Sequence, residues 1–293
     1  LSFALLLIFC IFCSILSGCA PGSKSSSSEP PVYSPLRVLV PEAPGSNTLG
    51  SSPLTLDVSN NTQGYFVAQS DSADLVTSLQ ITAPTGVLYA YFIDPGENAV
   101  IPFTEGNGDY TVVGYQQIQG DQYAALYSEI LTVELENDFL PFLYPNQYVN
   151  FSPDSEASKL ALSMVSEDTT DVDALKQIYN YVVNNLTYDY DKAETVETGY
   201  LPDVDETLST KTGICFDYAA LTTAMLRSCD IPCKLQIGYT GDIKHAWIDV
   251  YIRSKGWVNN AVSYKGDSWS LMDPTFDSNS DDKEAIQEYI GDE

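Results

Sequence analysis

Short stretches in which apolar and polar residues alternate dominate the chain between residues 54 and 135. Turn-forming residues such as Asp94-Pro95-Gly96 and Gly106-Asn107-Gly108 separate them. The stretches are LTLDV, GYFVAQ, LVTSLQITA, VLYAYFI, NAVIPF, DYTVVGYQQI and ALYSEILTVEL. Alternation with a period of two, interrupted about every ten residues, predicts short antiparallel strands. The first half of the folded chain is therefore expected to consist of packed antiparallel sheets.

The spacing of apolar residues changes to that of helices in the second half. Leu175, Ile178 and Val182 are three and four positions apart, which places them on one helix face. The stretch CFDYAALTTAMLR is small or apolar around its whole circumference, which is typical of a buried helix. Helices followed by strands indicate an α+β domain. The patterns predict helices over residues 155–166, 172–185 and 215–227, a long loop over residues 189–213, and strands over residues 234–239, 245–252, 257–262 and 268–273.

These patterns divide the folded chain into two domains. Seven strands in residues 53–136 predict an immunoglobulin-like β-sandwich. Residues 154–293 are expected to form the α+β domain. The intervening residues 137–153 are rich in aromatic and apolar side chains and contain prolines, so we expect a linker that packs between the domains.

The N-terminal residues 1–18 have the composition of an export signal. Their first part, LSFALLLIFCIFCSIL, is apolar and uncharged, and its length suits a signal peptide better than a membrane span. The sequence Leu-Ser-Gly-Cys that ends at Cys19 resembles a bacterial lipobox, which implies lipidation of Cys19. Serine and proline then dominate, so residues 19–52 are expected to be a disordered tether. An uncleaved transmembrane helix is the alternative for the first segment.

Charge excludes one large class of partners. The chain has 13 basic and 40 acidic residues, which gives a formal net charge of -27. This charge repels the phosphate backbone of nucleic acids, so we expect no nucleic-acid partner. His245 is the only histidine, which excludes histidine-rich zinc or di-iron centres. Neither a metal nor a cofactor is expected.

Three cysteines, Cys215, Cys229 and Cys233, lie in the folded part of the chain. An odd number cannot pair completely, so at least one thiol stays free. Cys229 and Cys233 lie in an apolar stretch, which favours two buried reduced thiols over a disulfide between them. No chemistry is assigned to these two residues.

Cys215 begins the predicted buried helix, where backbone N–H groups and the helix dipole are expected to lower the thiol pKa. Gly213 would let a substrate carbonyl approach the backbone closely. Amide chemistry also needs a base, and His245 can supply it from the start of a predicted strand. Asp273 ends the last predicted strand and can orient the imidazole. The sequence thus predicts a triad of Cys215, His245 and Asp273.

The segments TGICFDYAALTTAMLRSCDIPCKLQIGY, KHAWIDVYI and LMDPT resemble the transglutaminase-like superfamily. The resemblance extends over residues 175–276. It implies a transglutaminase-like α+β fold, related to papain-like cysteine proteases, and places the nucleophile, base and orienting acid on Cys215, His245 and Asp273. It also implies an oxyanion hole in which the Cys215 backbone N–H is one donor and Tyr188 is a candidate for the second.

These features predict an extracytoplasmic lipoprotein of a bacterial cell surface, anchored in the membrane by the lipid on Cys19. Its substrate would be a protein or peptide of the cell envelope. The triad would act on amide or peptide carbonyls through a thioester, with acyl transfer to an amine. Two alternatives stay open. One is a cysteine protease or amidase of envelope proteins or peptidoglycan peptides, and the other is a catalytically inactive adhesion or assembly module.

Overall fold

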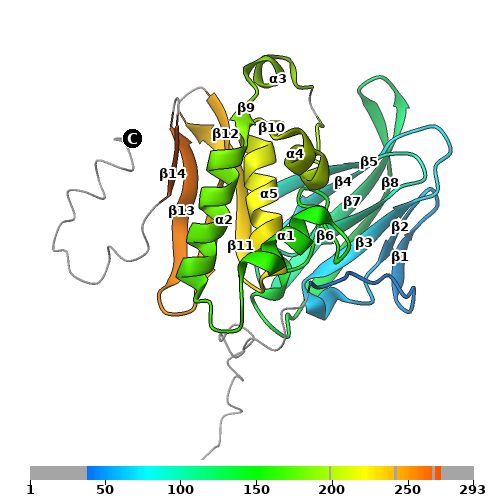
Figure 1. Ribbon diagram of the computed structural model, residues 1–293. Coiled ribbons are helices and arrows are strands. Elements are labelled where there is room, and N and C mark those ends of the chain that lie inside the picture. The colour runs from blue at the N-terminus through cyan, green and yellow to red at the C-terminus, as the bar shows by residue number, and fades with distance from the viewer. Residues whose placement is uncertain (1–37, 198, 241–242, 266–267, 272–293) are drawn as a thin grey trace, which may run out of the picture.

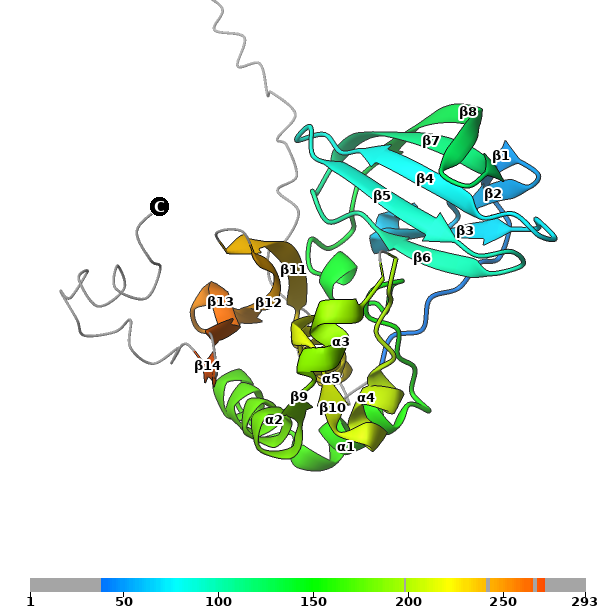
Figure 2. The same ribbon diagram turned by 90° about the horizontal axis from the view of Figure 1, so that it is seen from above.

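The computed structural model describes residues 38–197, 199–240, 243–265 and 268–271. An N-terminal β domain and a C-terminal mixed α/β domain lie side by side (Figures 1 and 2). The predicted signal segment, Cys19 and Asp273 lie outside the described residues. Within the described ranges, none of the helices combines the length and apolar character that crossing a membrane requires.

Two four-stranded antiparallel sheets form the β domain. The first has the strand order β1-β2-β3-β6 and the second the order β5-β4-β7-β8. Apolar side chains from both sheets, including Phe66 and Val112, share one core. The strands are β1 (Thr48–Ser51), β2 (Leu54–Asp57), β3 (Tyr65–Ser70), β4 (Thr77–Thr82), β5 (Leu88–Ile93), β6 (Asn98–Pro102), β7 (Gly108–Gln119) and β8 (Gln122–Val133), with the short 3-10 helix η1 (Asn61–Gln63) before β3.

Each of the seven predicted stretches overlaps one of these strands, and β3, β7 and β8 extend beyond their stretches, whereas the sequence pattern does not predict β1. Its sequence, TLGS, has no long apolar side chain except Leu49, so alternation gives little signal there. The sequence predicts a disordered tether over residues 19–52, but residues 38–52 belong to the folded part of the chain and include β1. Val38 is only 5% exposed and packs in the core of the C-terminal domain, which anchors this part of the chain.

The C-terminal domain packs helices on one face of an antiparallel sheet with the strand order β11-β12-β13-β14. Ala220, Leu221 and Met225 of α5 are completely buried, so this helix lies inside the domain as its composition predicts. Helix α5 (Cys215–Ser228) packs on β11 (Cys233–Thr240) and β12 (Ile243–Ile252), and α1 (Glu156–Met164) and α2 (Asp171–Asn185) pack against α5. The other two strands of the sheet are β13 (Gly256–Lys265) and β14 (Ser268–Leu271).

Two short helices occupy much of the region that was expected to be a long loop. They are α3 (Tyr190–Thr195) and α4 (Val204–Thr210), flanked by the two-residue strands β9 (Thr187–Tyr188) and β10 (Thr212–Gly213). The side chains of Asp189 and Asp203 accept hydrogen bonds from backbone N–H groups in the first turns of α3 and α4. Helices this short show no apolar periodicity. The capping residues Asp189 and Asp203 are the sequence features that could indicate them.

The linker contacts both domains. Tyr148 borders both hydrophobic cores, and its ring centroid lies 5.4 Å from that of Tyr91 in β5 and 6.1 Å from that of Phe216 in α5. Phe142, in the 3-10 helix η2 (Leu140–Phe142), packs edge to face against Trp257 of β13. The linker therefore connects the β domain to the helix that begins with Cys215.

Candidate active site

A short parallel ladder brings Tyr188 to Cys215. β9 pairs with β10 so that Tyr188 lies opposite Gly213, two residues before Cys215. The Asp189 N–H donates to the Gly213 carbonyl oxygen at 3.0 Å. In this position the Tyr188 hydroxyl donates a hydrogen bond to the Cys215 sulfur and accepts one from the Cys215 backbone N–H.

Two backbone N–H groups also contact the Cys215 sulfur. The N–H groups of Phe216 and Ala246 both donate to it. Ala246 belongs to β12 and directly follows His245, so the thiol lies between the start of α5 and the strand that carries the histidine. Cys215 is partly exposed, whereas Cys229 and Cys233 are free buried thiols.

The pKa of the Cys215 thiol is raised above its ordinary value of 9.0. Burial is the main cause, and the negative charge of Asp217 acts in the same direction. The hydrogen bonds from Ala246, Phe216 and Tyr188 oppose the rise without cancelling it. The expectation that the helix terminus lowers this pKa is therefore wrong, because desolvation of the thiolate outweighs its hydrogen bonds.

His245 lies beside Trp247 on β12. The alternate residues of this strand, Ala246 and Ile248, enter the domain core. The planes of the His245 and Trp247 rings differ by only 20°, and the ring centroids are 6.1 Å apart. Burial lowers the pKa of His245 from 6.5, which favours the neutral imidazole at pH 7. A neutral imidazole is the form that can accept a proton.

Gly238 of β11 makes room for Trp247. Gly238 is the cross-strand partner of His245, and a Cβ at this position would lie 2.7 Å from the Trp247 ring. Trp247 therefore lies over the glycine, where it packs beside the imidazole. The sequence contains Trp247 in the HAW segment, but its contact with Gly238 depends on the register of β11 and β12.

Asp217 is a completely buried carboxylate in the first turn of α5. It accepts a hydrogen bond from the Ile214 backbone N–H at 2.8 Å and forms an ion pair with Lys192 of α3 at 2.8 Å. A Cβ on Gly213 would lie 2.6 Å from the Cβ of Asp217. The glycine thus accommodates Asp217, which is a different reason for its presence from the approach of a substrate carbonyl.

The structure brings together Cys215, Tyr188 and the strand that carries His245. The third member of the predicted triad, Asp273, lies outside the described residues. In the part of the chain that the structure describes, no group of three or more His, Cys, Asp or Glu side chains is arranged to hold a metal ion. The arrangement is that of a thiol held among hydrogen-bond donors, next to a strand with an imidazole.

Comparison with known proteins identifies the domain. Residues 158–262 match the family model described as the transglutaminase-like superfamily, so the chain contains a domain of this superfamily. The UPF0252 protein MJ1282 of Methanocaldococcus jannaschii is 34% identical over an alignment of 102 residues, and the match covers 31% of this chain and 29% of that protein. The match thus spans less than a third of the curated relative.

Two solved structures are similar to a larger part of the chain. A proposed cysteine protease from Cytophaga hutchinsonii has a TM-score of 0.34 and 16% identity, with 72% of this chain and 74% of that chain covered. A proposed protease from Parabacteroides distasonis has a TM-score of 0.31 and 12% identity, with 72% and 62% covered. Both TM-scores are below 0.5, so neither likeness supports a functional assignment.

The ionisation of Cys215 and His245 can be measured directly. We expect the His245 imidazole to titrate below pH 6.5 and the Cys215 thiol to titrate above pH 9.0, because burial disfavours both charged forms. As the only histidine, His245 gives unambiguous imidazole C–H signals in NMR titrations. The rate of Cys215 alkylation by iodoacetamide against pH, read by peptide mass spectrometry, gives the thiol value.

The variant Cys215→Ala is the control for this titration. It should leave the His245 titration almost unchanged if thiol and imidazole are both neutral at rest. A Cys215 midpoint below 9.0, combined with a His245 value that falls when the thiol is removed, would instead indicate a thiolate–imidazolium pair.

Proposed function

We propose that the C-terminal domain is a cysteine acyltransferase of transglutaminase-like type that acts on amide or peptide carbonyls, with Cys215 as the nucleophile. The environment of the sulfur carries this proposal. It is partly exposed at the first turn of a buried helix and contacts Tyr188 and the strand of His245. The match of residues 158–262 to the superfamily model supports an enzyme with this chemistry.

In the proposed reaction the Cys215 thiol passes its proton to His245, and the sulfur attacks the carbonyl carbon. The carbon–nitrogen bond then breaks, and the leaving amine takes the proton from the imidazolium, which leaves a thioester on Cys215. An amine or water attacks the thioester and gives a proton to His245. The proton returns to the sulfur as the product leaves. Asp273 would orient the imidazole in each step.

Tyr188 and the Cys215 backbone N–H are the proposed donors to the oxyanion. Negative charge develops on the carbonyl oxygen as the sulfur attacks, and donors already in place stabilise it. In the free protein the Tyr188 hydroxyl contacts both the sulfur and this N–H. A substrate carbonyl oxygen would take the place of these contacts.

We further propose that the protein is a lipoprotein held outside a bacterial cell membrane by the lipid on Cys19, and that its substrates are envelope proteins or peptides. The apolar leader and the serine-rich tether support this location.

An immunoglobulin-like assignment of the β domain is supported by Tyr110, at the start of β7. Its hydroxyl donates to the Gly106 carbonyl oxygen at 2.9 Å, as in the tyrosine corner of such sandwiches.

The decisive experiment supplies a fluorescent primary amine to the purified protein together with an envelope extract. A transamidase attaches the amine to an acceptor protein or peptide, whereas a protease or amidase produces new termini or free ammonia without fluorescent product. Mass spectrometry distinguishes these results, and we expect the labelled product. Absence of both activities in a protein whose Cys215 still reacts with iodoacetamide would favour the inactive adhesion or assembly module.

A further inference from the structure

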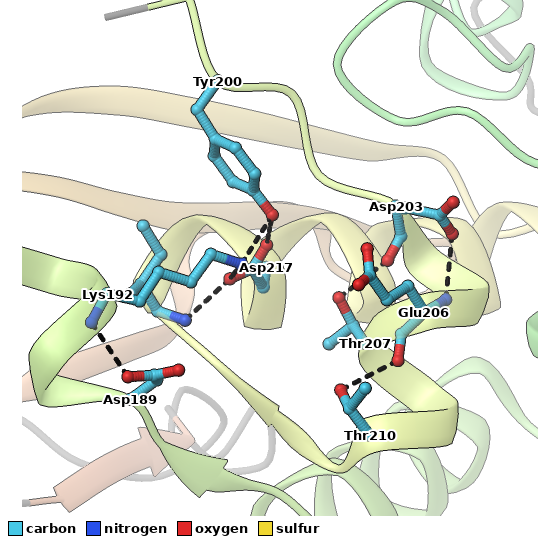
Figure 3. A network of polar contacts seen from close by, with 9 residues as sticks. Asp189, Lys192, Tyr200, Asp203, Glu206, Thr207, Thr210 and Asp217 are labelled. Carbon is cyan, nitrogen blue, oxygen red and sulfur yellow. Dashed lines mark hydrogen bonds and ion pairs between the residues drawn. The ribbon is translucent and has the colours of Figure 1, made fainter. Parts of the chain in front are cut away.

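A closed set of three polar side chains lies at the start of α5 (Figure 3). The Lys192 ammonium donates to one carboxylate oxygen of Asp217 at 2.8 Å, and the Tyr200 hydroxyl donates to the other. Lys192 also donates to the Tyr200 hydroxyl at 2.7 Å, and its nitrogen lies 4.4 Å from the centre of the Tyr200 ring. Every oxygen of this set therefore has a partner.

The set connects one continuous segment to the helix of Cys215. Lys192 comes from α3 and Tyr200 from the chain between α3 and α4, whereas Asp217 is the third residue of α5. Asp217 also accepts the Ile214 N–H at 2.8 Å, and the Tyr200 ring packs edge to face against Phe216 at 6.3 Å. The start of α5 is thus held at Ile214, Phe216 and Asp217, which flank Cys215 in the chain.

A buried carboxylate needs this kind of pairing. Asp217 is completely buried, and an unpaired charge there would be costly. Its negative charge also disfavours the neighbouring Cys215 thiolate. Lys192 offsets that charge. Tyr188 from β9 is a further titratable group that contacts the thiol, and the backbone N–H of Ala246, the residue after His245 in β12, donates to the sulfur.

We propose that Lys192, Tyr200 and Asp217 are positioning residues that hold the first turn of α5, and with it the Cys215 thiol and its N–H donors, in the reactive orientation. This inference rests on the proposed nucleophilic role of Cys215 and deepens it. Asp217 fixes the backbone of the turn, the Tyr200 ring packs against Phe216, and Lys192 reduces the effect of the buried carboxylate on the thiolate.

The test measures the alkylation rate of Cys215 against pH, which requires a reactive thiol but no substrate. Lys192→Met leaves the charge of Asp217 uncompensated. It should raise the midpoint of the Cys215 alkylation–pH profile by roughly half to one pH unit. Asp217→Asn removes the negative charge and should lower it by a similar amount. The double variant should return close to the wild type. Lys159→Met is the control, because this lysine pairs with Glu156 on an exposed face of α1.

Opposite shifts in the two single variants would support the electrostatic part of the proposal, since a purely structural role would move both midpoints the same way or neither. Unchanged midpoints, or shifts in the same direction, in variants that still unfold cooperatively would overturn it. If Lys192→Met does not fold, Lys192→Arg replaces it. This variant retains the charge and must keep the wild-type midpoint, and a raised midpoint would overturn the proposal.

A separate variant tests the contribution of the Tyr200 hydroxyl to the set. Tyr200→Phe keeps the ring against Phe216 but removes the hydroxyl, and it should raise the alkylation midpoint less than Lys192→Met does. A Tyr200→Phe midpoint equal to that of the wild type would remove Tyr200 from the set. If these variants behave as expected but the wild-type protein turns over no amide, the positioning role stands and the proposed function fails.

Discussion

Replacing Cys215 with alanine is expected to abolish turnover, with a loss of at least about 10³-fold. The sulfur is the atom that would form the thioester, and the buried thiols Cys229 and Cys233 cannot replace it. Burial raises the pKa of each of these two thiols to about 12, which keeps them protonated. The alanine variant should still fold, because Cys215 lies at a helix start and is partly exposed.

Product formation with a labelled amine, together with mass spectrometry of the Cys215 peptide after iodoacetamide treatment, measures this effect. Circular dichroism and thermal unfolding show whether the fold is retained. Cys229→Ala is the matched control, since it removes a buried thiol with no proposed chemistry and should keep both activity and Cys215 labelling. Full activity in Cys215→Ala would refute the nucleophilic role.

Replacing Arg227 with methionine is expected to lower the free energy of unfolding by about 2–4 kcal/mol. Arg227 is only 4% exposed, near the end of α5. Its guanidinium donates to the carbonyl oxygen of Cys233 at 2.8 and 3.1 Å, and to that of Tyr144 at 2.6 Å. Burial lowers the arginine pKa to about 10.

Methionine fills much of the same volume but leaves two carbonyl oxygens without these donors. Cys233 begins β11 and Tyr144 belongs to the linker. Loss of the Arg227 hydrogen bonds therefore weakens the contacts of α5 with both the sheet and the linker. Urea unfolding followed by circular dichroism measures the change. Lys255→Met, an exposed substitution on the same domain, should stay within about 0.5 kcal/mol of the wild type. Equal stability of the two variants would contradict a structural role for Arg227.

Several features of the site could be predicted from the sequence because they depend on neighbours along the chain. A run of small and apolar residues predicts that α5 is buried, and its first residue is Cys215. Alternation in HAWIDVYI predicts that Ala246 and Ile248 enter the core while His245 takes the other side. The seven predicted strands of the β domain follow from the same period of two, whereas β1 has too few apolar residues to show it.

Other features follow only from contacts between distant segments. The parallel pairing of β9 with β10 brings Tyr188 to Cys215 across an intervening pair of helices, and no local pattern encodes that pairing. Asp217 looks like a surface residue in the sequence, yet it is buried because Lys192 and Tyr200 neutralise and hydrogen-bond its carboxylate. Gly238 makes room for Trp247 only because the register of β11 and β12 sets it opposite His245.

The sequence by itself determined which residues line the longer helices and most strands of this protein, since the apolar period of a helix or strand depends on consecutive positions. Only the tertiary structure decided the electrostatics of the thiol. The expected helix-terminus effect is local, but desolvation depends on everything packed around the sulfur, and at Cys215 that burial, together with the charge of Asp217, outweighs the donors supplied by α5, β12 and Tyr188.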